Sequence, residues 1–448
     1  MKKMLVLEFN ELCPPLIERF ISEGELPNFE KLRKDSLAME TETDAKGEDL
    51  NPWVQWLDLH TGQDWQEHGI KELNKLKDFK GQFTWDILSE KYGLKNWICG
   101  SMNAKYSSVF KGRFLPDPWC TDIQPTHDEG MHDYYKFVSQ SVHSHSGSES
   151  ISQLEFAKSI LKQGVRVSTL FGLFGQILKE KLFKRDDWKR AMWLDRIQLD
   201  IFQYHYRKDN PEFATFFSNA VAHFQHHYWK DFEPEKFSHT SAEINHETKD
   251  AIRLAYKNTD YLLGKLRELV GEETAIVFTT ALSQEPYVKN ERHYYHITSQ
   301  EHFRKQFGVP ENAKYKPIMA EQFHLELADE QSAIDLEEKL SKYVMDSNDY
   351  FHVGSDHMFL LSREANILLI QCRCTKLVSE NAVYFDETNP DEKFSFGDAF
   401  YRMNEVKTGM HNPVGLYWFK ASNGQPNPEK GRVKPSQVHN DILAYFST

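Results

Sequence analysis

Residues 4–24 read MLVLEFNELCPPLIERFISEG, and this stretch decides the fold class. Its first six residues form a short apolar run, which is typical of a buried strand. Pro14 and Pro15 suit the first turn of a helix, and Gly24 suits the C-terminal cap of that helix. A buried strand that leads directly into a helix predicts an α/β fold.

The remainder of the chain continues this alternation. Further strands are predicted at 96–101, 213–219 and 274–281. Residues 365–374 are predicted to form another strand, either of the same sheet or of an appended hairpin. Long helices are predicted at 82–92, 186–207 and 244–270. We expect one α/β domain over residues 1–448, with a mostly parallel central sheet flanked by helices. Irregular aromatic segments at about 100–210 and 290–400 predict insertions that form a lid. The polar segment 139–150, SQSVHSHSGSES, predicts a mobile surface loop.

The composition is that of a soluble globular protein. Charged residues make up 27% of the 448 residues and hydrophobic residues 40%. The net charge of −13 argues against nucleic-acid binding and against general binding to anionic membranes. No apolar run reaches the roughly 18 residues of a membrane span or the length of a signal peptide, so a cytoplasmic protein is expected. The five cysteines are odd in number and are expected to be free thiols.

Four polar stretches stand where predicted strands end or helices begin. They are EFN at 8–10, the segment 51–70, NAVAHFQHHYW at 219–229 and TGMHNPVGLYWF at 408–419. Ligands of open α/β sheets collect at the carboxyl ends of the strands. We therefore expect these stretches to converge on one site.

The histidines of residues 219–229 favour a metal site. Imidazoles spaced three or four residues apart share one face of a helix, and a catalytic zinc takes about three protein ligands. Within this stretch, His223 shares a predicted helical face with His226 or His227, so either pair could supply two ligands. One ion of this kind acts as a Lewis acid on a phosphoryl oxygen or generates hydroxide from water.

Two interpretations without a metal stay open. In the first, histidine acts as a general base, and Asn10, Asn51 and Asn219 bind a phosphate or a sugar. In the second, the histidines only pack in an aromatic turn. Glu8 and Glu11 are interpreted as a strand-end charge and a capping charge.

The polar stretches also carry a family resemblance. The phrases, in chain order, are LVLEFN (5–10), GELPNFEKL (24–32), WLDLHTG (56–62), HGI (68–70), AHFQHHYW (222–229) and GMHNPVG (409–415). Their order resembles the alkaline phosphatase superfamily, in particular its type I phosphodiesterase/nucleotide pyrophosphatase branch. The resemblance implies an α/β fold, two metal ions bound by Asp and His, and a Ser or Thr nucleophile.

The chain departs from that family at most of the positions that matter. The positions that differ are Asn10 and Ala222 in place of Asp, Ala281 and Leu282 in place of an Asp and a His, and Pro52, beside Asn51, in place of the nucleophile. Only His226 and His411 match, so the resemblance implies these two as metal ligands, with a third from Asn219, His223 or His227. A two-metal site with a covalent phospho-enzyme is therefore not expected.

These observations predict a divergent phosphoesterase or phosphoryl transferase for a small phosphorylated, nucleotide- or sugar-linked substrate. The site is expected to hold one divalent ion, zinc or manganese, or none. The predicted catalytic residues are His223, His226 and His411, and the predicted substrate-binding residues are Asn10, Asn51, Asn219 and His227. The alternatives are a metal-independent glycosyl or related group transferase that uses a histidine base, and a non-catalytic protein that binds a phosphorylated ligand or a protein partner.

Overall fold

The structure is a computed structural model of the full chain. It describes residues 2–447 except 74, 121, 127–128, 143–159, 184–186, 238–243, 289–292, 319–321, 347–356, 375–376, 403–406 and 423–430. Most of the predicted loop at 139–150 therefore lies outside the described residues.

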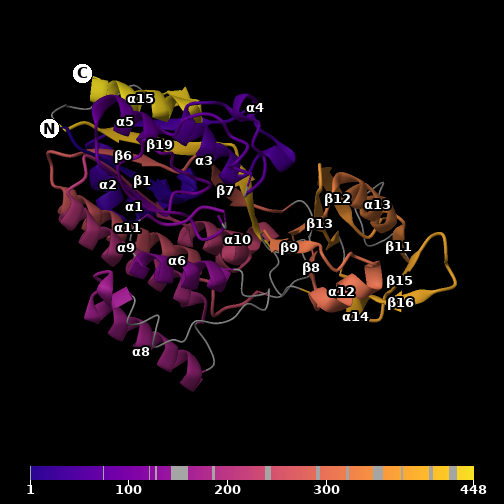
Figure 1. The fold of residues 1–448 in the computed structure, drawn as a ribbon. Helices are drawn as coiled ribbons and strands as arrows, with labels where there is room; N and C mark the ends of the chain where they lie inside the picture. Colours follow the sequence, from indigo (N-terminus) through magenta and orange to yellow (C-terminus); the bar gives the residue numbers. More distant parts are fainter. Residues whose placement is uncertain are drawn as a thin grey trace.

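An eight-stranded sheet forms the middle layer of the larger body (Figure 1). In spatial order its strands are β20 (Arg432–Val433), β2 (Leu37–Glu42), β19 (Val414–Lys420), β6 (Ala275–Thr279), β1 (Met4–Phe9), β5 (Phe213–Ser218), β3 (Asn96–Cys99) and β4 (Gly112–Leu115). β1 pairs in parallel with both β5 and β6, whereas β19 runs antiparallel to β2 and β6. The predicted mostly parallel sheet is thus confirmed.

Helices cover both faces of the sheet. One face carries α1 (Pro14–Ser22), α2 (Pro27–Lys34), α9 (Arg190–Asp209), α10 (Ala220–Phe232) and α11 (Ala251–Val270). The other carries α3 (Pro52–Thr61), α5 (Thr84–Tyr92) and α15 (Pro435–Ser447). Strand β1 serves both cores, because Leu5 and Leu7 face the first set of helices and Val6 faces the second.

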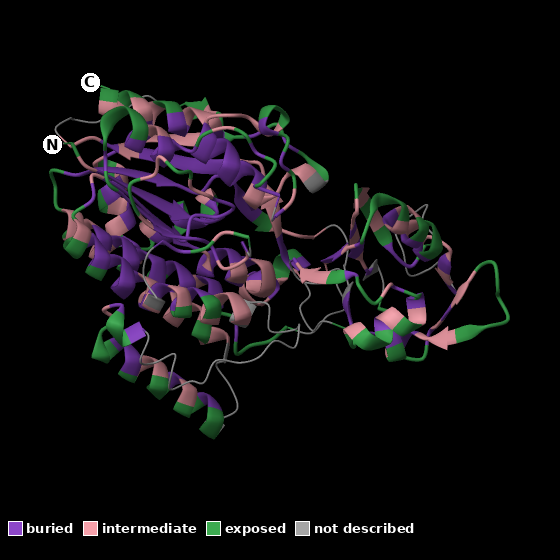
Figure 2. Cartoon of the chain, viewed as in Figure 1, coloured by how far each residue is buried: buried purple, intermediate pink, exposed green. Residues whose placement is uncertain are grey.

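A separate region contains β8 (His293–Ile297) to β17 (Phe400–Arg402) and has its own buried interior (Figure 2). Its other strands are β9 (Lys314–Pro317), β10 (Phe323–Glu326), β11 (Tyr343–Met345), β12 (Leu360–Glu364), β13 (Ile367–Gln371), β14 (Arg373–Cys374), β15 (Val383–Asp386) and β16 (Lys393–Ser395). Its helices are α12 (Gln300–Phe307), α13 (Glu330–Leu340) and α14 (Phe396–Ala399). The strand predicted at 365–374 lies here, as β13 and β14.

Residues 100–210 are divided between the sheet and its outer side. Strand β4 lies at the edge of the sheet and α9 packs against it, while α6 (Glu129–Val142) and α8 (Val167–Phe183) lie outside α9 (Figure 1). Among the helices in the described part of the chain, none has the length and apolar character needed to cross a membrane. Cys13, Cys99, Cys120 and Cys372 are buried free thiols, as predicted.

Candidate metal centre

The candidate site lies beyond the carboxyl ends of β1, β5 and β6. Glu11 follows β1, His226 lies on α10 after β5, and His411 lies on β18 (Gly409–Asn412). Strand β18 pairs with β7 (Ser283–Pro286), which follows β6, and this pairing sets Gln284 opposite His411. Three segments that are far apart in the sequence therefore meet at one edge of the sheet, as the pattern of polar stretches predicts.

Glu11 is held in a backbone conformation that few residues other than glycine adopt. Its φ is 60°, and its side chain is 2% exposed. The backbone carbonyl of Glu11 accepts a hydrogen bond from Nε2 of Gln225 at 2.7 Å, and Oε1 of Gln225 accepts one from the hydroxyl of Tyr256 at 2.7 Å. Left-handed conformations of this kind cost about 1–2 kcal/mol and persist where the surrounding structure imposes them.

The carboxylate of Glu11 faces two imidazoles. Its Oε2 lies 3.2 Å from Nε2 of His226 and 3.6 Å from Nε2 of His411. The ligand atoms of all three residues lie within 4.8 Å of one another. Ligands bound at about 2.0–2.1 Å to a tetrahedral zinc ion lie about 3.3 Å apart, so this donor set fits a divalent metal ion.

Hydrogen bonds to the backbone orient both imidazoles. Nδ1 of His226 lies 2.9 Å from the carbonyl oxygen of Gly409, and Nδ1 of His411 lies 2.8 Å from that of Leu50. A carbonyl only accepts, so each Nδ1 carries the hydrogen. In the neutral rings, each Nε2 therefore presents its lone pair towards Glu11, which is the arrangement that second-shell carbonyls impose on histidine ligands of metals.

A ring of amides surrounds Glu11. Nδ2 of Asn10 donates to Oε1 of Glu11 and to Oδ1 of Asn219, both at 2.8 Å. Oδ1 of Asn10 accepts from the indole of Trp56 at 2.7 Å. Nε2 of Gln284 donates to Oε2 of Glu11. Asn10 is thus turned towards Glu11 and the protein interior.

The protonation states suit a metal site. Burial opposes ionisation of Glu11, but His411, His226 and the amide of Gln284 outweigh it and lower the pKa of Glu11 to about 2. Burial lowers the pKa of His411 to about 4. The first shift favours the carboxylate of Glu11 and the second favours the neutral imidazole of His411. A bound cation would supply the positive charge that a neutral His411 does not, so these are the forms that suit a metal ion.

The other predicted residues lie around these three. The ring of His227 lies 6.5 Å from that of His226 and 4.6 Å from that of His223, between ring centres. Burial lowers the pKa of His223 to about 4 and that of His227 well below its usual value. Asn51 precedes α3 and follows Leu50, whose carbonyl orients His411.

Sequence reasoning missed Glu11. The interpretation of Glu11 as a capping charge is wrong, because the side chain is buried and faces two histidines. Glu8, interpreted as a strand-end charge, is the penultimate residue of β1; it is buried, with its carboxylate 3.0 Å from Nε2 of His60. The available signal was a second carboxylate directly after the first buried strand, in the EFNE of residues 8–11.

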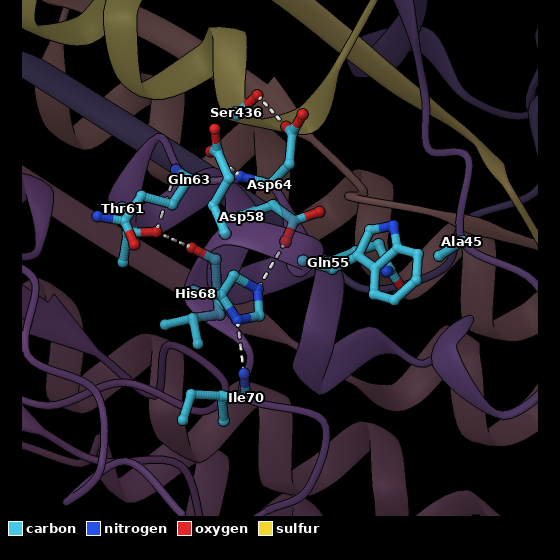
Figure 3. Close-up of polar contacts among 12 residues, drawn as sticks. Ala45, Gln55, Asp58, Thr61, Gln63, Asp64, His68, Ile70 and Ser436 are labelled. Atoms are coloured by element: carbon cyan, nitrogen blue, oxygen red, sulfur yellow. Dashed lines mark hydrogen bonds and ion pairs between the residues drawn. The ribbon is translucent and has the colours of Figure 1, made fainter.

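Another histidine–carboxylate pair, His68 with Asp58, closes the turn between α3 and α4 (Trp65–His68) (Figure 3). Nδ1 of His68 accepts from the backbone N–H of Ile70 at 3.0 Å, so its Nε2 carries the hydrogen that faces Asp58, at 2.8 Å. Burial raises the pKa of Asp58 to about 9 and lowers that of His68 to about 4. This pair is neutral at pH 7 and is structural.

Comparison with known proteins finds only distant structural similarity. No family model matches the chain, and no curated protein matches its sequence. Phosphonoacetate hydrolase from Sinorhizobium meliloti 1021, solved with phosphonoformate, is 12% identical, with a TM-score of 0.43 over 99% of this chain and 95% of that one. Murine ectonucleotide pyrophosphatase/phosphodiesterase 5 is 10% identical, with a TM-score of 0.40 over 100% and 95%.

Proposed function

We propose that the protein is a single-metal phosphoesterase or phosphoryl transferase that acts on a small phosphorylated, nucleotide- or sugar-linked substrate. The proposed ligands are Glu11, His226 and His411. A divalent ion held by them acts as a Lewis acid towards a phosphoryl oxygen.

The convergence of one carboxylate and two oriented imidazoles carries this proposal. Oε2 of Glu11 lies 3.2 Å and 3.6 Å from the two Nε2 atoms, and both Nδ1 atoms are bonded to carbonyls. The side chains of His226 and His411 are each 14% exposed, whereas that of Glu11 is 2% exposed. The histidine side is therefore the less buried side of the site. Three protein ligands leave one position of the ion open, and we propose that the substrate reaches it from that side.

The surrounding residues have separate proposed tasks. Asn10 positions Glu11, because its amide donates to that carboxylate and to Asn219. His223 and His227 have lowered pKa values, so at neutral pH they are hydrogen-bond acceptors for substrate hydroxyls more than proton donors. Asn51 is proposed to bind the substrate at the start of α3.

The chemistry is proposed to proceed without a covalent phospho-enzyme. The position that carries the Ser or Thr nucleophile in the family that the sequence resembles is Pro52, and Asn51 beside it has no hydroxyl. Water, or the hydroxyl of an acceptor substrate, is then the nucleophile. The resemblance in the order of the phrases is what favours phosphate-containing substrates.

Metal content is the first test. Elemental analysis after incubation with Zn²⁺ or Mn²⁺ and removal of unbound ion should find about one ion per chain. Glu11→Gln, His226→Ala and His411→Ala should each lose it. His324→Ala is the matched control, because His324 forms a histidine–carboxylate pair with Glu72, at 3.0 Å, outside the site.

Activity is then measured on chromogenic phosphomonoesters and phosphodiesters with the ion that binds. Glu11→Gln, His226→Ala and His411→Ala should each lower kcat/KM at least about 100-fold. The control His324→Ala should have the kcat/KM of wild type. Wild-type protein that takes up neither ion contradicts the metal proposal.

A second candidate is a metal-independent group transferase. The observation in its favour is the 3.2 Å contact between Nε2 of His226 and Glu11, which also suits a protonated imidazole beside a carboxylate. Loss of activity in His226→Ala without any bound metal would support it. Ligand binding with no turnover under either ion would support a non-catalytic protein.

A further inference from the structure

Helix α8 exposes a continuous apolar stripe. Its members are Val167, Phe171, Phe174, Leu178 and Leu182, with exposed fractions between 58% and 72%. At about 100° per residue these five side chains fall within an arc of roughly 80° on the helix. Scattered exposed apolar residues are ordinary on a protein surface, but a stripe of this length marks a binding surface.

The inner side of α8 is bonded to α9, so the stripe cannot turn inward. The hydroxyl of Thr169 donates to Oδ2 of Asp200 at 2.6 Å. Nε of Arg190 donates to Oε2 of Glu180 at 2.6 Å, near the other end of the helix. Leu170 is buried in the core that α9 also forms. Exposure of the stripe is therefore a property of the folded chain, and α8 lies at the margin of the molecule (Figure 2).

The charges beside the stripe are positive. Lys181 and Lys179 are exposed and lie on opposite sides of the stripe. Arg166, just before the helix, is 46% exposed but is paired with Asp200, so the two lysines supply the charge. Glu180, the single acidic residue between Val167 and Phe183, faces the protein and is paired with Arg190. The outer face of α8 thus combines phenylalanine and leucine with lysine and carries no carboxylate of its own.

We propose that α8 is an interfacial anchor that lies flat on an anionic phospholipid bilayer. An apolar stripe with lysines on both sides suits that surface, because the apolar side chains enter the acyl boundary and the ammonium groups reach the headgroups. The chain's net charge of −13 does not oppose this, since charges more than about 8 Å away are screened at physiological salt.

A second copy of the chain fits the stripe less well. Two α8 helices packed stripe to stripe would bring the lysines of one helix to those of the other, or to Arg166, with no carboxylate on either outer face. Charge complementarity therefore favours a lipid surface over self-association.

Vesicle co-sedimentation of the full chain tests the anchor. The vesicles contain phosphatidylcholine alone, or phosphatidylcholine and phosphatidylglycerol at about three to one, in about 0.1 M and about 0.5 M NaCl. Wild-type protein should sediment with the anionic vesicles and be released at the higher salt. Phe171→Ser/Phe174→Ser and Lys179→Glu/Lys181→Glu should each weaken binding at least about tenfold. Leu377→Ser, at an exposed apolar residue outside α8, is the control and should bind as wild type does.

Several outcomes overturn the proposal. Binding that is equal on neutral and anionic vesicles, or that survives Phe171→Ser/Phe174→Ser, overturns it. A wild-type chain that sediments with neither vesicle also overturns it and leaves the stripe to a protein partner. A dimer in lipid-free light scattering that the phenylalanine variant abolishes assigns the stripe to a second copy. Thermal unfolding of each variant shows whether it is folded.

Discussion

At the scale of single residues, the site depends on where hydrogens are placed. The carbonyls of Gly409 and Leu50 bind the Nδ1 hydrogens of His226 and His411, and this leaves the Nε2 atoms for Glu11. The amide of Asn10 supplies two hydrogens, one to Glu11 and one to Asn219. An acid at position 10 would offer none of these.

We therefore expect Asn10→Asp to destabilise the metal-free protein by about 2 kcal/mol or more. The carboxylate of the variant would face the oxygens of Glu11 and Asn219, which are also acceptors, without a hydrogen to donate to either. Urea unfolding of the variant and of wild type, with and without Zn²⁺, measures this loss of unfolding free energy. Zn²⁺ should stabilise the variant more than the wild type, since the ion offsets the added negative charge. Asn381→Asp, at an exposed turn, should have no effect. Equal stability of Asn10→Asp and wild type would contradict the role given to Asn10.

At the scale of elements, close approach of helices and strands builds both the site and its support. Gly409 on β18 comes so near α10 that a Cβ there would lie 2.4 Å from the carbonyl oxygen of Gln225. This contact brings His411 beside His226. On the other face of the sheet, α15 packs on α3, and His439 of α15 lies over Gly62, the C-cap of α3.

Gly62 and Gly69 form a matched pair of helix C-caps. Their φ values are 72° and 67°, but a Cβ on Gly62 would lie 2.4 Å from the ring of His439, whereas nothing lies within 4 Å of one on Gly69. Gly69→Ala should lower the unfolding free energy by about 1 kcal/mol, because alanine adopts the left-handed conformation less readily than glycine does. Gly62→Ala should cost about 2 kcal/mol more, because the ring must move. If Gly62→Ala and Gly69→Ala lose equal unfolding free energy in urea, the ring of His439 on α15 moves aside without cost, and the prediction is wrong.

His439 should make stability depend on pH. Burial lowers its pKa to about 4, and its Nδ1 lies 2.8 Å from the hydroxyl of Thr84. A folded-state pKa below the unfolded value means that its contribution is complete above about pH 6.5 and is lost as the pH falls towards 4. Between about pH 7 and pH 4.5, the stability advantage of wild type over His439→Gln should shrink by about 2–3 kcal/mol. A constant difference in urea unfolding would contradict this.

At the scale of the whole molecule, the chain has more than one interior. The two cores on either side of the main sheet share β1, whereas the core of the region from β8 to β17 is formed only by residues between Tyr295 and Phe400. Phe307 lies fully buried at its centre, in contact with Tyr343 and Tyr384.

Phe307→Ala should therefore destabilise that region by about 3–5 kcal/mol and leave the main sheet intact. Hydrogen exchange should show lost protection in α12 and β15, with α11 unchanged, and the metal content should match that of wild type. Loss of protection across the whole chain would show that the two bodies unfold as one unit.

Local pattern in the sequence was enough to determine the α/β class, because a buried apolar strand followed by Pro14 and Pro15 has one regular continuation. The resemblance in the order of the phrases singled out His226 and His411, because only these two of the family's ligand positions match. The position of Glu11 beside the two histidines was decided only by tertiary structure. Its left-handed backbone and its contact with two histidines depend on α10 and β18, more than two hundred residues away in sequence. The exposed stripe of α8 is likewise a tertiary outcome, because which face of a helix is covered depends on what packs against it.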